Sequence, residues 1–172
     1  MFSFFKKTKT EKINDQWLKS YHKKNPVSLT KRQSMQLEIE ALQRLHKNYK
    51  CNCGNTHVNH FPIVKNINWD KLTITLTDCG ETVLNIRERS RIYPDNFVMF
   101  SEQVKCIVDN LKRNNIQHLD IHRNNICIKN SVICLIDFDI SIIDSNPLNE
   151  HIERRALLTM PPEREIKKMI LL

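Results

Sequence analysis

The sequence contains very little glycine, since only Gly54 and Gly80 among its 172 residues are of this type. Loops that cradle phosphate groups with backbone amides place several glycines close together, because the backbone must come very near the phosphates. Two widely separated glycines cannot form such a loop. Any phosphate-binding function of this chain must therefore use a different arrangement, in which Lys7, Lys9 or Lys12 could partly replace the missing backbone donors.

Long apolar segments are also missing. No stretch approaches the roughly 18 apolar residues of a membrane-spanning helix, and the apolar run at the N-terminus is too short for a signal peptide. Hydrophobic residues still make up 40% of the chain, which is enough for a core in one domain or in two small lobes. We therefore expect a globular protein without membrane association.

The six cysteines do not suggest a disulfide framework. Cys106, Cys127 and Cys134 lie inside apolar runs, which is typical of reduced cysteines in a core. This pattern predicts a reducing compartment, such as the cytoplasm.

A group of cysteine and histidine residues raises the question of a zinc site. Cys51, Cys53, His57 and His60 are close in sequence, but gaps of one and two residues are tighter than the usual spacings of zinc motifs. We therefore expect a loop here that leads into a strand over residues 61–64.

The net charge of +8 attracts nucleotides, nucleic acids and acidic proteins alike, so it selects no partner. Nucleic-acid binding is not expected, because the basic residues are spread out and lack the interleaved aromatic residues of a stacking surface. Basic residues gather in two segments, an N-terminal arm (Lys6, Lys7, Lys9, Lys12) and a loop over residues 85–92 (Arg87, Arg89, Arg91). Both are typical of solvated regions, although the loop could meet phosphate or an acidic substrate.

The most informative stretch is residues 118–139. A polar loop precedes two short apolar runs, and Lys129-Asn130-Ser131 between these runs supplies turn residues, so the pattern predicts a loop followed by a β-hairpin. The hairpin would bring Asp137 back beside Asp120 and Asn125. Carboxylate and amide oxygens suit Mg²⁺, and a carboxylate can position an attacking hydroxyl during phosphoryl transfer. The alternative is a surface hairpin with two structural aspartate caps.

This stretch resembles the catalytic and metal-binding segments of protein kinases. His118-Leu119-Asp120 is similar to the His-Arg-Asp motif, Asn125 follows Asp120 at the family's spacing, and Asp137-Phe138-Asp139 is similar to Asp-Phe-Gly. The resemblance implies that ATP and Mg²⁺ are bound. It also implies that Asp120 orients the acceptor hydroxyl and that Asn125 and Asp137 hold the metal.

A kinase-like lysine–glutamate pair can also be assigned. Residues 17–21 predict a short strand that carries Lys19, and residues 28–47 predict a helix whose Glu38 lies at the edge of the apolar face. In kinases such a lysine holds the α- and β-phosphates and pairs with the helix glutamate. The alternative is a solvent-facing lysine and an ordinary surface glutamate.

The resemblance places two further residues at the nucleotide. Residues 71–77 alternate between apolar and polar types, as a half-buried strand does, and the segment after them is similar to the kinase hinge, where adenine binds backbone groups. Gly80 of this segment and Cys127 are assigned to the nucleotide site on this basis. A plain turn is the alternative for the segment around Gly80.

The sequence departs from the kinase pattern at several positions. Besides the missing glycine-rich loop, Leu119 replaces the motif arginine, and Asp139 replaces a glycine and should restrict the backbone. His122 stands where protein Ser/Thr kinases usually carry a lysine, which is closer to kinase-like enzymes that act on small molecules. His122 could still donate a hydrogen bond to phosphate.

The expected fold is α+β and kinase-like with two lobes: a small β-sheet lobe with one helix over residues 1–80, and a reduced, mainly helical lobe over residues 81–172. Helices are predicted from about Asp95, over residues 149–158 and from Glu163 onward. The expected function is ATP- and Mg²⁺-dependent phosphorylation of protein Ser/Thr hydroxyls. A kinase for small molecules, favoured by His122 and the short second lobe, and a non-catalytic nucleotide-binding protein, favoured by the missing loop, are the alternatives.

Overall fold

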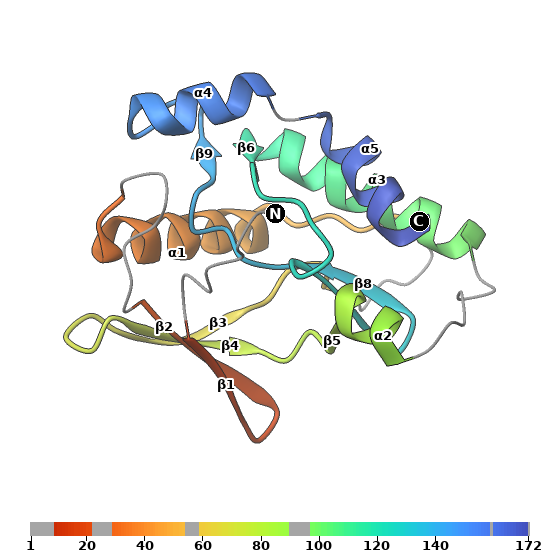
Figure 1. The fold of residues 1–172 in the computed structure, drawn as a ribbon, viewed down its shortest axis with the longest axis horizontal. Helices are drawn as coiled ribbons and strands as arrows, with labels where there is room; N and C mark the ends of the chain where they lie inside the picture. Colours follow the sequence, from red (N-terminus) through yellow and green to blue (C-terminus); the bar gives the residue numbers. More distant parts are fainter. Residues whose placement is uncertain (1–8, 22–28, 54–58, 90–96, 159, 172) are drawn as a thin grey trace.

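The structure, a computed structural model, describes residues 9–21, 29–53, 59–89, 97–158 and 160–171 (Figure 1). It has an α+β fold with antiparallel strand pairing. The described strands are β1 (Lys9–Ile13), β2 (Gln16–Ser20), β3 (Val64–Asn68), β4 (Thr73–Thr77), β5 (Glu81–Thr82), β6 (Ile116–Gln117), β7 (Ile126–Lys129), β8 (Val132–Leu135) and β9 (Ile142–Ile143). The described helices are α1 (Lys31–Lys47), α2 (Val83–Arg89), α3 (Phe97–Arg113), α4 (Glu150–Leu158) and α5 (Pro162–Leu171).

The first four strands form one antiparallel sheet in the order β1-β2-β4-β3. Strands β1 and β2 form a hairpin closed by Asn14 and Asp15, and Asn14 has the positive φ of 55° that tight hairpin turns require. Lys9–Ile13, predicted as part of a solvated arm, form the edge strand β1, and the side chains of residues 10–13 are exposed. Strand β3 begins at Val64, later than predicted, and Lys6 and Lys7 lie outside the described residues.

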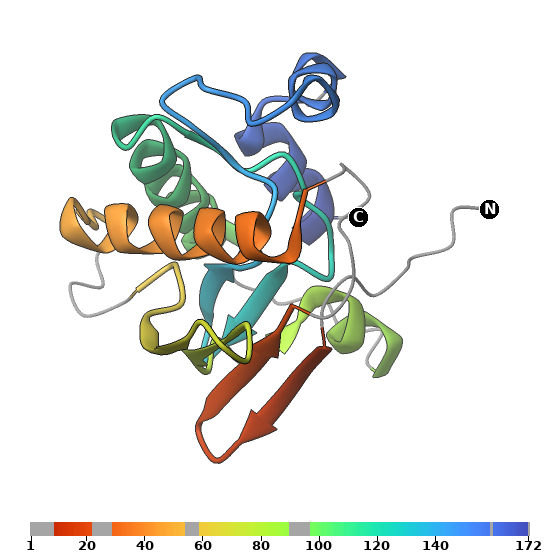
Figure 2. The same ribbon diagram turned by 90° about the vertical axis from the view of Figure 1, so that its left-hand side faces the viewer.

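Helix α1 follows the predicted apolar periodicity. Thr30 caps its N-terminus: its side chain accepts a hydrogen bond from the Gln33 amide, while the Gln33 side chain accepts one from the Thr30 amide. This capping box begins the helix later than the predicted residue 28, which lies outside the described residues. In Figures 1 and 2, α1 lies between the four-stranded sheet and helices α3 and α4.

The predicted hairpin in the central stretch is confirmed. Strands β7 and β8 pair from Ile126 with Leu135 to Lys129 with Val132. Asn130 and Ser131 between them have φ angles of 50° and 63°, as a two-residue hairpin turn of the favoured twist requires. Strand β5 pairs with β7 on the other side, which completes a second, three-stranded sheet.

The helical predictions were correct for α4 and α5, and Pro162 is the first residue of α5, where its missing N–H costs nothing. The predicted loop over residues 85–92 was wrong in part, because Val83–Arg89 forms helix α2. The structure does not describe Asp95, the predicted helix cap. It also does not describe Arg91 or the side chains of Arg87 and Arg89.

Among the described helices, none combines the length and the hydrophobicity needed to cross a bilayer.

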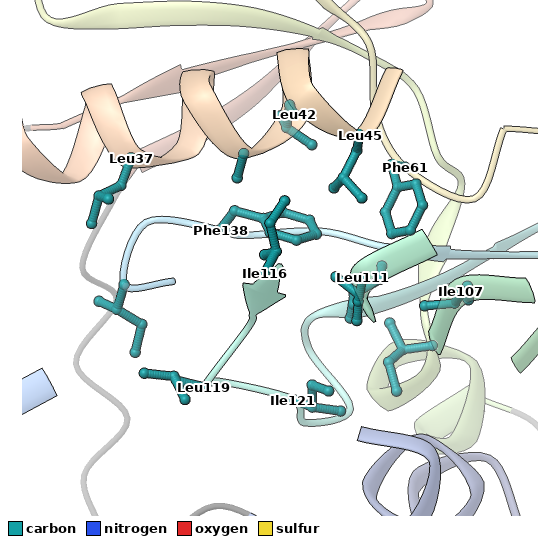
Figure 3. Packing of buried hydrophobic residues seen from close by; sticks show 14 of the residues in the cluster. Leu37, Leu42, Leu45, Phe61, Ile107, Leu111, Ile116, Leu119, Ile121 and Phe138 are labelled. Atoms are coloured by element: carbon teal, nitrogen blue, oxygen red, sulfur yellow. The ribbon is translucent and has the colours of Figure 1, made fainter. Parts of the chain in front are cut away.

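The hydrophobic core joins these elements. Phe138 is fully buried and lies beneath α1, near Leu42 and Leu45 (Figure 3). Its ring contacts Phe61 edge-on, with 6.0 Å between the ring centroids. Burial of a phenylalanine of this kind is worth about 1.5–3 kcal/mol. The core therefore fixes the chain immediately after Asp137 against the helix that carries Glu38.

Candidate active site

Lys19 and Glu38 are in direct contact in the interior of the protein. Lys19 is 3% exposed and Glu38 is fully buried, and the Lys19 ammonium donates a hydrogen bond to Glu38 Oε2. Tyr21 donates a second hydrogen bond from its hydroxyl to the same oxygen. The arrangement excludes the solvent-facing alternative for both residues of the predicted pair.

Asp137 is the second acidic partner of Lys19. Its Oδ1 atom lies 2.5 Å from Lys19 Nζ, although the two residues are far apart in sequence. Burial would lower the pKa of Lys19, but the charges of Asp137 and Glu38 raise it above its ordinary value. Burial would likewise raise the pKa of Asp137, but Lys19 holds it below its ordinary value. Lys19 and Asp137 are therefore both ionised at neutral pH, whereas burial raises the pKa of Glu38.

Asp120 and Asn125 form a second cluster beside this one. Asn125 Nδ2 donates to the Asp120 backbone carbonyl at 2.9 Å and lies 3.3 Å from the carboxylate oxygen Oδ2. This orientation directs the other end of the amide, the oxygen Oδ1, away from Asp120. The backbone joins this cluster to Asp137, because the amide of the preceding residue, Ile136, donates to the Asn125 carbonyl at 2.9 Å. The three oxygen-bearing residues predicted from the sequence are thus brought together.

His118 connects the loop of Asp120 to the end of β8. Its Nε2 atom lies 2.9 Å from the Ile136 carbonyl, and its Nδ1 atom accepts a hydrogen bond from the Asp120 amide. Burial lowers the pKa of His118, so the ring is neutral, with Nε2 as the donor. The ring also packs edge-on against Phe138, with centroids 4.6 Å apart. His118 therefore positions Asp120 relative to Asp137.

Two residues of the site have a strained backbone. Leu119 has a φ of 62° and Asp137 a φ of 71°, a region that non-glycine residues rarely adopt. Each such residue costs about 1–3 kcal/mol, and such strain persists where the surrounding structure fixes the conformation, often at functional sites. The strain falls on the residue before Asp120 and on Asp137 itself.

Arg155 of α4 is a member of the site that the sequence did not indicate. Its Nη2 atom donates to Asp120 Oδ1, and its Nε atom donates to the Leu119 carbonyl at 2.7 Å. His122 approaches the other carboxylate oxygen, with Nε2 at 3.5 Å from Asp120 Oδ2. Asp120 therefore lies between a guanidinium and an imidazole.

Two other contributions to the site were not expected from the sequence. One is the hydrogen bond from Tyr21, and the other is the charge of Asp139, which contributes to the raised pKa of Lys19.

Gly80 is required by close packing. Its φ is 89°, and a Cβ atom there would lie 2.3 Å from the Ile128 carbonyl oxygen. A side chain at this position would force β5 away from β7. Cys127 lies on β7 and is buried, which raises the pKa of its thiol to about 12. Gly80, just before β5, and Cys127 thus both belong to the region of the three-stranded sheet β5-β7-β8, whereas Lys19 belongs to the four-stranded sheet.

The donor set fits a magnesium ion. Mg²⁺ takes oxygen ligands and is usually held by one or two carboxylates with substrate phosphates and water. Asp137 offers a carboxylate whose side chain is 24% exposed, and Asn125 offers its amide oxygen. No sulfur or nitrogen ligand is needed, so these two residues suit this hard cation.

A comparison with models of known protein families and with curated protein sequences finds no match for this chain. The function is therefore inferred from the geometry of the site.

Proposed function

We propose that this protein is an ATP- and Mg²⁺-dependent phosphotransferase of the protein kinase-like type that phosphorylates Ser/Thr hydroxyls of proteins. In this proposal the fold is the two-lobed kinase-like fold, with residues 1–80 as the smaller lobe and residues 81–172 as a reduced second lobe. ATP and the protein substrate would bind where the two meet.

The observation that carries the proposal is the position of Lys19 between Glu38 and Asp137, with Asp120 and Asn125 beside them. A buried lysine that shares two carboxylates is costly to assemble, because each charge must be desolvated. A purely structural role would be filled as well by apolar residues. A site that must bind the phosphates of ATP gives a reason for this particular set of charges.

Each residue has a defined task in the proposed reaction. Lys19 binds the α- and β-phosphates in exchange for its contact with Asp137, and Glu38 and Tyr21 hold Lys19 in place. Mg²⁺ held by Asn125 and Asp137 would supply positive charge to the phosphate oxygens. Asp120 accepts the hydroxyl proton of the acceptor, while Arg155 and His122 keep its carboxylate oriented.

The β1–β2 hairpin does not replace a glycine-rich loop through its turn. Lys19 pairs with Thr10 near the start of β1, so the Asn14-Asp15 turn lies at the far end of the hairpin. The ammonium of Lys12 binds Asp78 at 2.9 Å and would have to leave this partner to bind a phosphate. Lys7 and the side chain of Lys9 lie outside the described residues. These observations favour, as a second candidate, a protein that binds nucleotide without turnover.

A small-molecule phosphotransferase is the other candidate. The observation in its favour is His122, which lies 3.5 Å from Asp120 where protein kinases usually carry a lysine. It would use the same nucleotide site but a different acceptor.

The test is transfer of ³²P from γ-labelled ATP with Mg²⁺ to generic protein substrates, comparing the wild-type chain with Asp120→Asn. We expect labelling by the wild type and a loss of about 10²–10⁴-fold in the variant, the range for removal of a general base. Equal labelling by the two proteins would defeat the proposal. Mg²⁺-dependent thermal stabilisation by ATP without transfer to any acceptor would favour the binding protein, and transfer to metabolites alone would favour the small-molecule kinase.

A further inference from the structure

We infer that Cys51, Cys53, His60 and Cys106 form a structural Zn²⁺ site. It would join the segment between α1 and β3 to helix α3. The sequence led us to expect only a loop here, because its Cys and His residues lack the usual motif spacing. The fourth residue, Cys106, is far away in the sequence and could not be recognised from local spacing.

The four ligand atoms lie close enough together for one tetrahedral site. All of them lie within 4.8 Å of one another. His60 Nε2 is 3.7 Å from Cys51 Sγ and 3.4 Å from Cys53 Sγ. With Zn–S bonds of about 2.3 Å and Zn–N bonds of about 2.0 Å, neighbouring ligand atoms of a tetrahedron are about 3.5–3.8 Å apart. The two His60 separations are close to this range, whereas the Cys51–Cys53 separation of 3.0 Å must open by about 0.8 Å to reach the sulfur–sulfur value.

His60 is oriented as a metal ligand. It is fully buried, and its Nδ1 atom lies 2.7 Å from the Ile133 carbonyl. Since a carbonyl can only accept, Nδ1 carries the proton, and the lone pair is on Nε2, which faces the sulfur atoms. Zinc-bound histidines almost always donate their other N–H to a carboxylate or backbone carbonyl in this way.

The rest of the site is held in place before any metal binds. Asn110 of α3 donates to the Lys50 carbonyl at 2.6 Å and accepts from the Lys50 amide at 3.0 Å. This pair fixes the residue next to Cys51 against the helix that carries Cys106. The Tyr49 hydroxyl accepts a hydrogen bond from the His60 amide at 3.2 Å. These hydrogen bonds tie the loop to α3 and restrain the residues beside the ligands.

The ligand chemistry selects zinc. Three thiolates and one imidazole are soft ligands that suit Zn²⁺ and do not suit Mg²⁺ or Ca²⁺. Four protein ligands leave no open position, which is typical of structural sites. On binding, the three thiols release their protons to solvent and the imidazole binds in its neutral form. A disulfide between Cys51 and Cys53 is the competing explanation, but their sulfur atoms are 3.0 Å apart, well beyond the about 2.05 Å of an S–S bond.

The site would stabilise the strand that leads to Asp137. The His60 carbonyl accepts a hydrogen bond from the Leu135 amide at 2.9 Å, and His60 Nδ1 donates to Ile133, so His60 contacts β8 twice. Fixing His60 through zinc therefore fixes β8 and the start of the Asp137 segment. This inference stands independently of the proposed phosphotransfer, because it concerns metal content and stability alone.

The test is the metal content of the full-length chain, purified without a histidine tag and measured by inductively coupled plasma mass spectrometry. We expect about one zinc ion per chain. Removal of zinc with a chelator should lower the Tm by roughly 10 °C, and added zinc should restore it. Cobalt substitution should give the visible absorption of tetrahedral Co²⁺ with thiolate ligands. A wild-type protein that holds no zinc and shows no such absorption with Co²⁺ would overturn the inference.

Two variants assign the ligands. Cys106→Ser should lower the zinc content at least tenfold and weaken the thiolate absorption of the cobalt form. Cys79→Ser is the control, because Cys79 is a partly buried cysteine in another region, and this variant should keep its zinc. If Cys106→Ser fails to fold, His60→Cys provides the alternative: a site with four thiolates should retain metal and change the cobalt spectrum. Equal zinc loss in Cys79→Ser and Cys106→Ser, or an unchanged cobalt spectrum in His60→Cys, would contradict the assignment.

Discussion

At the scale of single residues, the burial of Lys19 matters most. A charged side chain that is 3% exposed must be compensated, and Glu38 and Asp137 supply the compensation from two other segments. Removal of one member of such a buried set typically costs about 3–5 kcal/mol, because it leaves the others uncompensated. Loss of activity in a Lys19 variant would therefore mix unfolding with chemistry, so a less buried residue gives a cleaner test.

Arg155 is that residue. Its contact with Asp120 and the Leu119 carbonyl orients the carboxylate without holding the core together, and its side chain is 37% exposed. If Asp120 receives the acceptor proton, Arg155→Ala should lower kcat by about 10²-fold, the cost of a misplaced catalytic group. The KM for ATP should change little, because in the proposed complex Lys19, and not Arg155, would face the phosphates.

Arg154 provides the matched control for this prediction. It is the neighbouring arginine on the same helix and is exposed. Steady-state kinetics of Arg154→Ala should match the wild type, and Arg155→Lys should recover part of the lost kcat. A fall in kcat that is equal in both alanine variants, or a rise in KM for ATP with unchanged kcat, would show that Arg155 does not position Asp120.

The sequence could indicate the residues of the central stretch because they lie close together in a pattern with a chemical meaning. Asp120, Asn125 and Asp137 were singled out in this way, and hydrogen bonds join Asn125 to Asp120 and to the residue before Asp137. Tyr21 and Arg155 could not be found, since an ordinary tyrosine and one of many arginines acquire their importance only through tertiary contacts. The same holds for Cys106, whose partners are far away in the sequence.

At the scale of helices and strands, regular patterns gave correct predictions. The apolar periodicity of α1 and the turn residues of the β7–β8 hairpin are strong local signals. The residues of β1 gave no such signal, because this edge strand, KTEKI, is almost entirely polar. Charged residues on edge strands are common, since they prevent pairing with other chains. Helix α2 is short, so its seven residues carry too little periodicity to be recognised.

Asp78 connects three strands from the segment between β4 and β5. Its carboxylate accepts hydrogen bonds from Lys12 of β1, Trp17 of β2 and Lys129 of β7, at 2.9, 2.9 and 3.0 Å. It also accepts one from the Gly80 amide, so it fixes the turn in which glycine is required. Burial would raise the pKa of Asp78, but these hydrogen bonds together lower it well below its ordinary value.

This lowered pKa predicts a pH-dependent contribution to stability. The pKa of Asp78 in the folded protein lies below its value of about 3.9 in the unfolded chain. The stabilisation that the Asp78 charge contributes is therefore fully present above about pH 3.9, and it is lost as the pH falls through the pKa of the folded protein. Asp78→Asn should therefore lower the free energy of unfolding by about 2 kcal/mol at pH 7, the scale of hydrogen bonds to a charged group. The difference from the wild type should shrink below about pH 4.

Urea unfolding at pH 7 and at pH 3.5 measures this difference. Asp70→Asn is the control, because Asp70 is exposed in the turn between β3 and β4. The free energy of unfolding of Asp70→Asn should be close to that of the wild type at both pH values. A difference for Asp78→Asn that is the same at both pH values would contradict the role assigned to its charge.

At the scale of the whole molecule, one core joins the regions that carry the candidate site. Helix α1 lies between the four-stranded sheet and the helices α3 and α4 (Figure 2), and Phe138 lies beneath it (Figure 3). Lys19 comes from the sheet, Glu38 from α1, Asp137 from the end of β8, and Arg155 from α4. The α+β class could be predicted from the sequence, but the way in which these elements bring four distant charges together depends on packing across the whole chain.

The measurement that tests the central claim most directly is a crystal structure of the full chain with a non-hydrolysable ATP analogue and Mn²⁺, with the metal located by its anomalous scattering. We predict Mn²⁺ bound by the Asn125 amide oxygen and the Asp137 carboxylate, with Lys19 on the α- and β-phosphates and Asp120 facing the γ-phosphate. A nucleotide and metal bound elsewhere on the chain, or a Lys19 that keeps its contact with Asp137 while the analogue is bound, would contradict the account.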